Sequence, residues 1–373
     1  MKTLKTLALL FVGALLFVGC ESNSGGDESG LFLRADKYDI YDDGKDCATF
    51  KVIYNGKELT EGYTIYDEND NPVGNKFSST TRGTFKFWAE HGAEMTKGYT
   101  AISVIATPPA APTLPIDNNP TKLDFNRRVL LLQFTGTGCQ FCPNMVNALY
   151  ALSKNDNFKN NIAIAAAHIG PYAGNDPALM VEGKTIDDAF GITGYPNLVV
   201  DMVKNNGSVY ANEAFIGTMI NTAMKRVSVK GGIAVNAEYH ANKDYVVINA
   251  LVKAKESADF RIGALLLEDN IYGAQSIAAG IVPGEGVDFN YHNNCIRRVR
   301  CEQNEADFTG YDLGNIKAGA TASKDFSFPL LKSWDPENLR VLVFISTKEG
   351  NSWYVNNVIT CPINGQTDFE YSK

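Results

Sequence analysis

Residues 128–154 read RVLLLQFTGTGCQFCPNMVNALYALSK and contain the segment that organises the rest of the chain. The opening run, RVLLLQF, is mostly apolar and has the length of a strand that is buried on both faces. Residues 144–153 then carry apolar side chains at helical spacing. The sequence therefore predicts a buried strand and an amphipathic helix, with Cys139 and Cys142 at the turn between them.

Similar elements follow downstream. Asn161–Ile169 and Asn197–Asp201 have the apolar character of further buried strands, and Glu213–Arg226 places apolar side chains on one helical face. Strands that alternate with helices are typical of an α/β layer. We therefore expect an α/β domain over residues 125–228.

The Cys-x-x-Cys pair suggests thiol chemistry. The free N–H groups and the dipole of a helix N-terminus stabilise an anion, so they lower the pKa of a nearby thiol. Cys139 is therefore the expected nucleophile, and Cys142 would attack the mixed disulfide and release the product. Pro143 is compatible with the first helical turn, where its missing N–H costs little.

Two other interpretations of the pair are a zinc site and a structural disulfide. A zinc site would need two further ligands, and none of the four histidines falls at a paired spacing, so we expect no metal and no cofactor. A purely structural disulfide stays open, because cysteines at this spacing oxidise readily outside the cytoplasm.

The first twenty residues resemble a bacterial lipoprotein signal. A basic start is followed by a short apolar run that ends LFVGC, which puts Cys20 at the acylation position. We expect a signal peptide over residues 1–19 and an acylated, flexible tether over residues 20–30. The alternative is a secretory signal with a chance cysteine.

The remaining pattern divides the chain further. Short alternating runs over residues 31–106 suggest an immunoglobulin-like β-sandwich, and the proline-rich residues 107–124 suggest a linker. Alternation returns over residues 229–373, as in a second β-sandwich. The expected fold class is multidomain α+β, with the α/β domain between two β-sandwiches.

Several short motifs together resemble a known family. They are Phe134-Thr135-Gly136, Cys139–Pro143, Gly194-Tyr195-Pro196, and His292-Asn293 followed by Arg297. With the lipoprotein signal, they resemble the Bacteroidetes outer-membrane lipoproteins related to the twenty-eight-kilodalton outer-membrane protein. The resemblance covers roughly residues 125–365.

The resemblance implies a thioredoxin-like fold for residues 125–228 and an outer-membrane location, on the periplasmic face or the cell surface. It also implies a cis Tyr195–Pro196 bond that faces the cysteines and forms part of a substrate groove. Two positions depart from the thioredoxin pattern. Gly138 stands where an aromatic residue is usual, and Gln133 stands where a buried acid is usual.

For a histidine and two further cysteines, the sequence predicts less specific roles. His168 ends the strand Asn161–Ile169 and is a possible auxiliary group to the thiolate, although a capped, solvated or core histidine is the commoner case. Cys295 and Cys301 are candidates for a local structural disulfide. Cys47 and Cys361 are left unassigned.

Composition limits the functional classes. Of 373 residues, 34 are Lys or Arg and 42 are Asp or Glu, which gives a net charge of −8. No long basic block is present, so we expect no nucleic-acid partner. We expect a membrane-anchored thiol-disulfide exchanger, held through Cys20, whose partners are extracytoplasmic proteins with thiols or disulfides. The alternative is a non-catalytic surface adhesin or receptor that uses the same fold as a scaffold.

Overall fold

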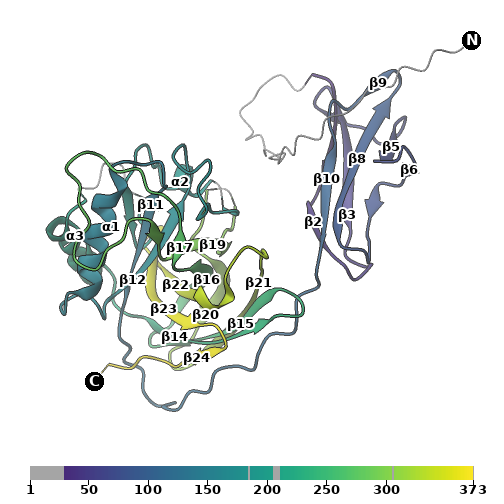
Figure 1. Ribbon diagram of the computed structural model, residues 1–373. Coiled ribbons are helices and arrows are strands. Elements are labelled where there is room, and N and C mark those ends of the chain that lie inside the picture. The colour runs from purple at the N-terminus through teal and green to yellow at the C-terminus, as the bar shows by residue number, and fades with distance from the viewer. Residues whose placement is uncertain (1–28, 184, 205–210, 305, 373) are drawn as a thin grey trace, which may run out of the picture. The chain divides into compact units, whose positions relative to one another are not determined.

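The computed structural model describes residues 29–183, 185–204, 211–304 and 306–372 (Figure 1). The chain separates into two compact units, one that ends at Thr107 and one that begins at Pro108. None of the described helices is long and apolar enough to cross a membrane.

The first unit consists of two β-sheets around one core. One sheet has the order β1-β3-β4, with β7 also on β3, and the other has the order β2-β10-β8-β5-β6, with β9 also on β8. The alternation in β3 buries Ala48, Phe50 and Val52, which pack in this core. Asn55 and Gly56 both have positive φ and connect β3 to β4 in a two-residue hairpin turn. The strands are β1 Leu31–Ala35, β2 Asp39–Tyr41, β3 Ala48–Tyr54, β4 Lys57–Glu58, β5 Thr64–Asp67, β6 Pro72–Val73, β7 Lys76–Phe77, β8 Gly83–His91, β9 Glu94–Met95 and β10 Thr100–Ile105.

The second unit is built on an eight-stranded sheet with the order β13-β11-β12-β19-β16-β22-β23, in which β20 also pairs with β16. A four-stranded sheet, β21-β15-β14-β24, and a two-stranded ribbon, β17-β18, complete the unit. Its strands are β11 Val129–Thr135, β12 Ile162–His168, β13 Asn197–Val200, β14 Gly231–His240, β15 Tyr245–Ala254, β16 Ala258–Glu268, β17 Ile271–Tyr272, β18 Tyr291–His292, β19 Cys295–Arg300, β20 Tyr311–Ile316, β21 Thr321–Pro329, β22 Leu339–Glu349, β23 Ser352–Pro362 and β24 Gly365–Thr367. Its helices are α1 Cys142–Lys154, α2 Ile186–Ala189, α3 Glu213–Arg226 and the 3₁₀ turn Pro336–Asn338.

The eight-stranded sheet is buried on both faces. One face of β11, β12, β16 and β22 packs in a core that also contains Ile186 of α2. On the opposite face, α1 and α3 cover β11 and β13. The four-stranded sheet covers the same face of β16 and β22. Successive side chains of β11 therefore meet different cores, which explains why this strand is apolar throughout.

The expectation of a separate thioredoxin-like α/β domain between two β-sandwiches is wrong. Strands predominate, and the sheet that holds β11, β12 and β13 continues through β19 into the C-terminal strands. The connection is the pair Ala166 and Cys295, where β12 meets β19 in parallel. The edge of β12 is thus covered by a strand that lies more than 120 residues downstream, so the residues after 228 complete this sheet as well as forming the four-stranded one.

The proline-rich segment is packed against the four-stranded sheet. Asn249 of β15 donates to the carbonyl of Pro112, at 3.1 Å. Lys253 is almost completely buried and bonds the Asp117 carboxylate at 2.7 Å and the Pro120 carbonyl at 2.7 Å. A buried ammonium group needs such partners to compensate for lost hydration. This part of the segment is therefore fixed to the second unit.

Candidate functional site

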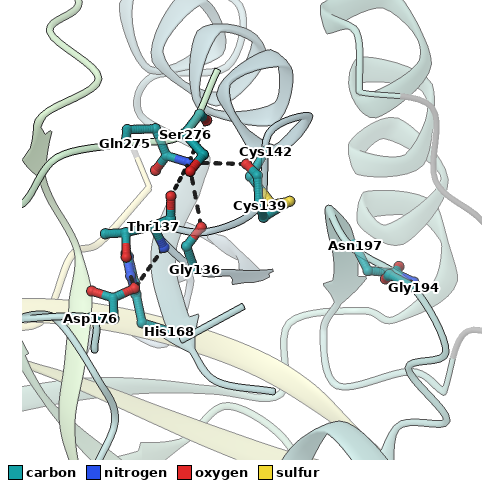
Figure 2. The surroundings of a disulfide bond; sticks show 10 residues. All are labelled: Gly136, Thr137, Cys139, Cys142, His168, Asp176, Gly194, Asn197, Gln275 and Ser276. Carbon is teal, nitrogen blue, oxygen red and sulfur yellow. Dashed lines mark hydrogen bonds and ion pairs between the residues drawn. A yellow bond between two sulfur atoms is a disulfide. The ribbon is translucent and has the colours of Figure 1, made fainter. Parts of the chain in front are cut away.

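A disulfide joins Cys139 and Cys142 in the turn between β11 and α1 (Figure 2). Helix α1 begins at Cys142, so Cys139 lies three residues before the first helical position. Cys142 is fully buried, whereas Cys139 retains 3% of its surface. Access therefore favours Cys139 as the sulfur that an incoming thiol would reach.

The start of α1 has no counter-charge. Its N-cap residue, Phe141, makes no side-chain capping bond, and the first turn contains no acidic residue. Helix α3 differs, since the Asn212 side chain caps it and Glu213 follows. Without a carboxylate or a side-chain cap, the positive end of the α1 dipole is available to stabilise a thiolate at the turn.

The turn that carries the cysteines packs tightly against Tyr172. The Gly138 N–H donates to the Tyr172 carbonyl, at 2.9 Å. A Cβ atom at residue 138 would lie 2.9 Å from the same oxygen, and one at Gly136 would lie 2.7 Å from it. Neither position can accept a side chain without moving the backbone, which gives a local reason for glycine before the first cysteine.

A distant segment holds the other side of the turn. We call residues 273–290 the strap. The N–H of Ser276 donates to the Thr137 carbonyl at 2.8 Å, and the N–H of Ala278 donates to the Gln140 carbonyl at 2.9 Å. The Gln275 side-chain amide adds a bond to the Cys139 carbonyl at 3.0 Å (Figure 2). The strap therefore fixes the backbone on both sides of the first cysteine.

The strap also crosses α1. The Asn147 side chain donates to the Val282 carbonyl and accepts from the Gly284 N–H, both at 2.9 Å. The strap is not predictable from the sequence. Its contacts with the cysteine turn use backbone groups and one glutamine, and its composition shows no strand or helix pattern. Its only signal is a run of small and apolar residues without charge over residues 273–284.

His168 is buried beneath the same turn, but its described contacts do not include the disulfide. Its Nδ1 lies 2.7 Å from Asp176 Oδ2, and the same oxygen accepts the Thr137 N–H at 2.7 Å (Figure 2). Burial raises the pKa of Asp176, but the hydrogen bond and charge of His168 outweigh burial and bring it to about 2. His168 thus positions a carboxylate that holds the turn. Its predicted auxiliary role toward the thiolate stays a prediction.

On its other side, His168 faces a buried thiol. Its Nε2 lies 3.6 Å from Cys295 Sγ, and its ring packs edge-on against His292 at a centroid distance of 5.0 Å. Burial raises the pKa of Cys295 far above its ordinary value, and burial lowers the pKa of His292. The Cys295 thiol is completely buried and protonated, which is the state of an unreactive cysteine.

The predicted disulfide between Cys295 and Cys301 is wrong, because both thiols are free. Cys295 begins strand β19 and Cys301 follows its last residue. An extended strand rises about 3.3 Å per residue, so their Cα atoms are about 20 Å apart, whereas a disulfide needs less than about 7 Å.

The intervening arginines do not form a free cationic patch either. Arg297 pairs with Glu268 at 2.6 Å. Arg298 and Arg300 both pair with Glu182, also at 2.6 Å. Each of the three guanidinium groups therefore has a carboxylate partner within the second unit, although two of them share one carboxylate.

The Tyr195–Pro196 bond is cis, as predicted. The Tyr195 hydroxyl donates to Asp187 at 2.9 Å, and the Tyr195 ring meets the Tyr172 ring edge-on at a centroid distance of 5.8 Å. Tyr172 therefore connects Tyr195 to the cysteine turn. In Figure 2, Gly194 and Asn197, which flank the cis bond, lie on the side of the disulfide opposite Gln275 and Ser276.

Three cysteines of the chain remain. Cys47 in the first unit and Cys361 in β23 are free thiols. The lipidation candidate Cys20 falls outside the described residues. Among the residues that the structure describes, no group of three His, Cys, Asp or Glu side chains could hold a metal ion.

Comparisons with known proteins point to one family. The model of a family described as outer membrane protein Omp28 matches residues 183–367. None of the curated proteins matches the chain.

Three solved structures are similar to parts of the chain. HBP35 of Porphyromonas gingivalis has 17% identity and a TM-score of 0.49, over 67% of this chain and 78% of that one. A domain of the outer membrane lipoprotein Omp28 from the same organism has 18% identity and a TM-score of 0.22, over 38% and 94%. A structural-genomics protein from Agrobacterium tumefaciens has 13% identity and a TM-score of 0.38, over 65% and 97%.

Proposed function

The chain belongs to the family related to outer membrane protein Omp28 and is an outer membrane protein, and from this premise we propose that it exchanges disulfides with extracytoplasmic proteins through Cys139 and Cys142. The observation that carries the proposal is the disulfide at the uncapped N-terminus of α1. A disulfide that only stabilised the fold would gain nothing from this position. A disulfide that must open gains a stabilised thiolate.

The proposed reaction starts from the disulfide form. A substrate thiolate attacks Cys139 Sγ, the bond between Cys139 and Cys142 breaks, and Cys142 leaves as a thiolate that takes up a proton. A second substrate thiolate then attacks the substrate sulfur of the mixed disulfide and releases Cys139. The substrate loses two electrons and two protons as it gains a disulfide, and the protein is left as a dithiol. Reduction of a substrate disulfide is the same sequence in reverse.

Anchoring at Cys20 belongs to the same proposal. Acylation there would hold the protein at the outer membrane, with residues 21–30 as a tether. The partners would be proteins outside the cytoplasm that carry exposed thiols or disulfides.

The decisive experiment compares Cys142→Ala with Cys139→Ala. In the Cys142→Ala variant the resolving thiol is missing, so mixed disulfides between Cys139 and partner proteins should accumulate. The Cys139→Ala variant should trap much less, because Cys142 is fully buried. Acid-quenched cells run on non-reducing gels, with a reduced lane for each sample, measure both.

Equal and negligible trapping by the two variants would contradict the proposal and favour an adhesin or receptor. The reduction potential of the pair provides an independent check. Exchangers lie at roughly −120 to −270 mV, whereas structural disulfides lie below about −300 mV.

A further inference from the structure

Three exposed apolar side chains lie in the cysteine turn or in segments that are hydrogen-bonded to it, and we call them the collar. They are Phe141, Tyr172 and Ile277, which are 53%, 46% and 45% exposed. Isolated apolar residues on a surface need no explanation, but a cluster around one reactive group does.

Hydrogen bonds of the cysteine turn place each member of the collar. Phe141 lies between the two cysteines in sequence. Tyr172 accepts the Gly138 N–H through its carbonyl. Ile277 lies between Ser276 and Ala278, whose N–H groups both donate to the turn. The three side chains come from separate parts of the chain but share this anchoring.

The chain segments that form the site carry no charged side chain, and the nearby Asp187 carboxylate accepts a hydrogen bond from the Tyr195 hydroxyl. Asp, Glu, Lys and Arg make up 20% of the chain, yet none occurs in the four segments at the site, which are residues 136–147, 170–175, 194–197 and 273–284. The nearest acid in sequence, Asp176, is buried against His168. The two acids of the strap, Glu285 and Asp288, come after the contact of Gly284 with α1.

From this arrangement we infer the substrate class, an inference that rests on the proposed exchange reaction. The collar binds an extended polypeptide segment whose cysteines are flanked by uncharged apolar residues. Contact removes apolar surface from water on both partners, which stabilises the complex. A charged flanking group would lose hydration at the collar without meeting an opposite charge, which costs free energy.

The test uses three synthetic peptides, each with two cysteines in the reduced state. The cysteines are flanked by leucine and alanine in the first, by aspartate in the second and by lysine in the third. The oxidised full-length protein is mixed with each peptide, and acid-quenched samples are scored by mass spectrometry for loss of two hydrogens. Each rate is divided by the rate of the same peptide with an uncharged disulfide, bis(2-hydroxyethyl) disulfide, which corrects for the intrinsic reactivity of its thiols.

The apolar peptide should react at least about fivefold faster than either charged peptide, since half of an aliphatic side chain's burial free energy corresponds to about this factor. Ile277→Asp should lower the apolar-peptide rate by a similar factor. The same variant is assayed with dithiothreitol, and the ratio of its peptide rate to its dithiothreitol rate should fall by this factor. Leu331→Asp is the matched control, because Leu331 is 44% exposed but makes no described contact with the cysteine turn. It should change neither rate.

The outcomes separate this inference from the reaction itself. If the protein oxidises neither dithiothreitol nor any peptide, the exchange function falls and the inference falls with it. If dithiothreitol reacts but the three corrected peptide rates are equal, or a charged peptide is fastest, the collar inference is wrong and the exchange function stands. If Ile277→Asp also slows the reaction with dithiothreitol, the uncharged variant Ile277→Ser is tested with both substrates. It separates loss of the apolar contact from damage to the disulfide site. A selective loss with the apolar peptide supports the inference, and an equal loss with both substrates overturns it.

Discussion

Replacing Asp176 with Asn should destabilise the second unit and loosen the cysteine turn. The Asp176 Oδ2 atom lies 2.7 Å from both the Thr137 N–H nitrogen and His168 Nδ1, and its Oδ1 accepts the Ala178 N–H at 2.8 Å. The contacts with His168 and Ala178 are buried, and the contact with Thr137 is partly buried. Asparagine has the same shape but only one acceptor oxygen, so its NH₂ group must face at least one backbone N–H.

The expected cost follows from this mismatch. A buried donor without an acceptor costs about 1–3 kcal/mol, and hydrogen bonds to a charged group contribute more than neutral ones. Loss of the carboxylate opposite His168 adds to this cost. We expect Asp176→Asn to lower the free energy of unfolding by about 3 kcal/mol at pH 7.

The pH dependence gives a second signature. The pKa of Asp176 is lowered from 3.8 to about 2 in the folded protein, so the carboxylate stabilises the fold above pH 4 and this contribution is lost as the pH falls toward 2. The shift corresponds to about 2 kcal/mol at neutral pH, of which about half is lost by pH 3. The difference in stability between wild type and Asp176→Asn should therefore narrow by about 1 kcal/mol between pH 7 and pH 3.

Urea unfolding followed by tryptophan fluorescence measures both effects. Trp334 and Trp353 lie in the second unit and Trp88 in the first, so all proteins should carry Trp88→Phe to isolate the relevant transition. Asp188→Asn is the control, since it makes the same charge change at an exposed position and should cost less than about 0.5 kcal/mol. An Asp176→Asn variant as stable as this control would refute the account of the buried carboxylate. The account would also be refuted if the difference in unfolding free energy between wild type and variant were the same at pH 3 as at pH 7.

Two further expectations concern the turn and the anchor. Gly138→Ala should lower the free energy of unfolding by about 1–3 kcal/mol, because its Cβ would meet a backbone oxygen at 2.9 Å. Gly174→Ala, which places its Cβ in open space, should cost clearly less in the same urea experiment, and equal costs would contradict the packing argument. Cys20→Ser should release the protein from membranes into the soluble fraction, measured by sedimentation after a salt wash. A variant that still pellets would contradict acylation at that cysteine.

Most strands of the second unit could be predicted because their burial follows their sequence pattern. The predicted buried strand Asn161–Ile169 is β12, Ile162–His168, and the predicted buried strand Arg128–Phe134 is β11, Val129–Thr135. The pairing of β19 could not be predicted. Its sequence, CIRRVR, has three arginines in six residues and looks like an exposed loop. It is a strand because carboxylates from outside it pair with the arginine side chains. They belong to Glu268, which ends β16, and to Glu182, which precedes α2.

The cysteine pair could be found from sequence because its spacing is local, and the cis Tyr195–Pro196 bond was predicted because the family resemblance implies it. The strap could not, since a backbone carbonyl or amide is present at every residue and leaves no signature. The contact between His168 and Asp176 could not be predicted either. His168 is a predicted candidate residue, but eight residues and a turn separate it from Asp176, and no spacing rule connects the two.

The contacts that escaped prediction matter most for how the disulfide opens and closes. Tyr172, the strap and Asp176 together bond the N–H groups of Thr137 and Gly138 and the carbonyls of Thr137, Cys139 and Gln140. A turn fixed at this many backbone groups loses little conformational freedom when its two sulfurs rejoin, so ring closure is close to a reaction between pre-oriented groups. Closure should then be faster than escape of a mixed disulfide from Cys139. For this reason covalent partners should be visible only when the Cys142 thiol is removed.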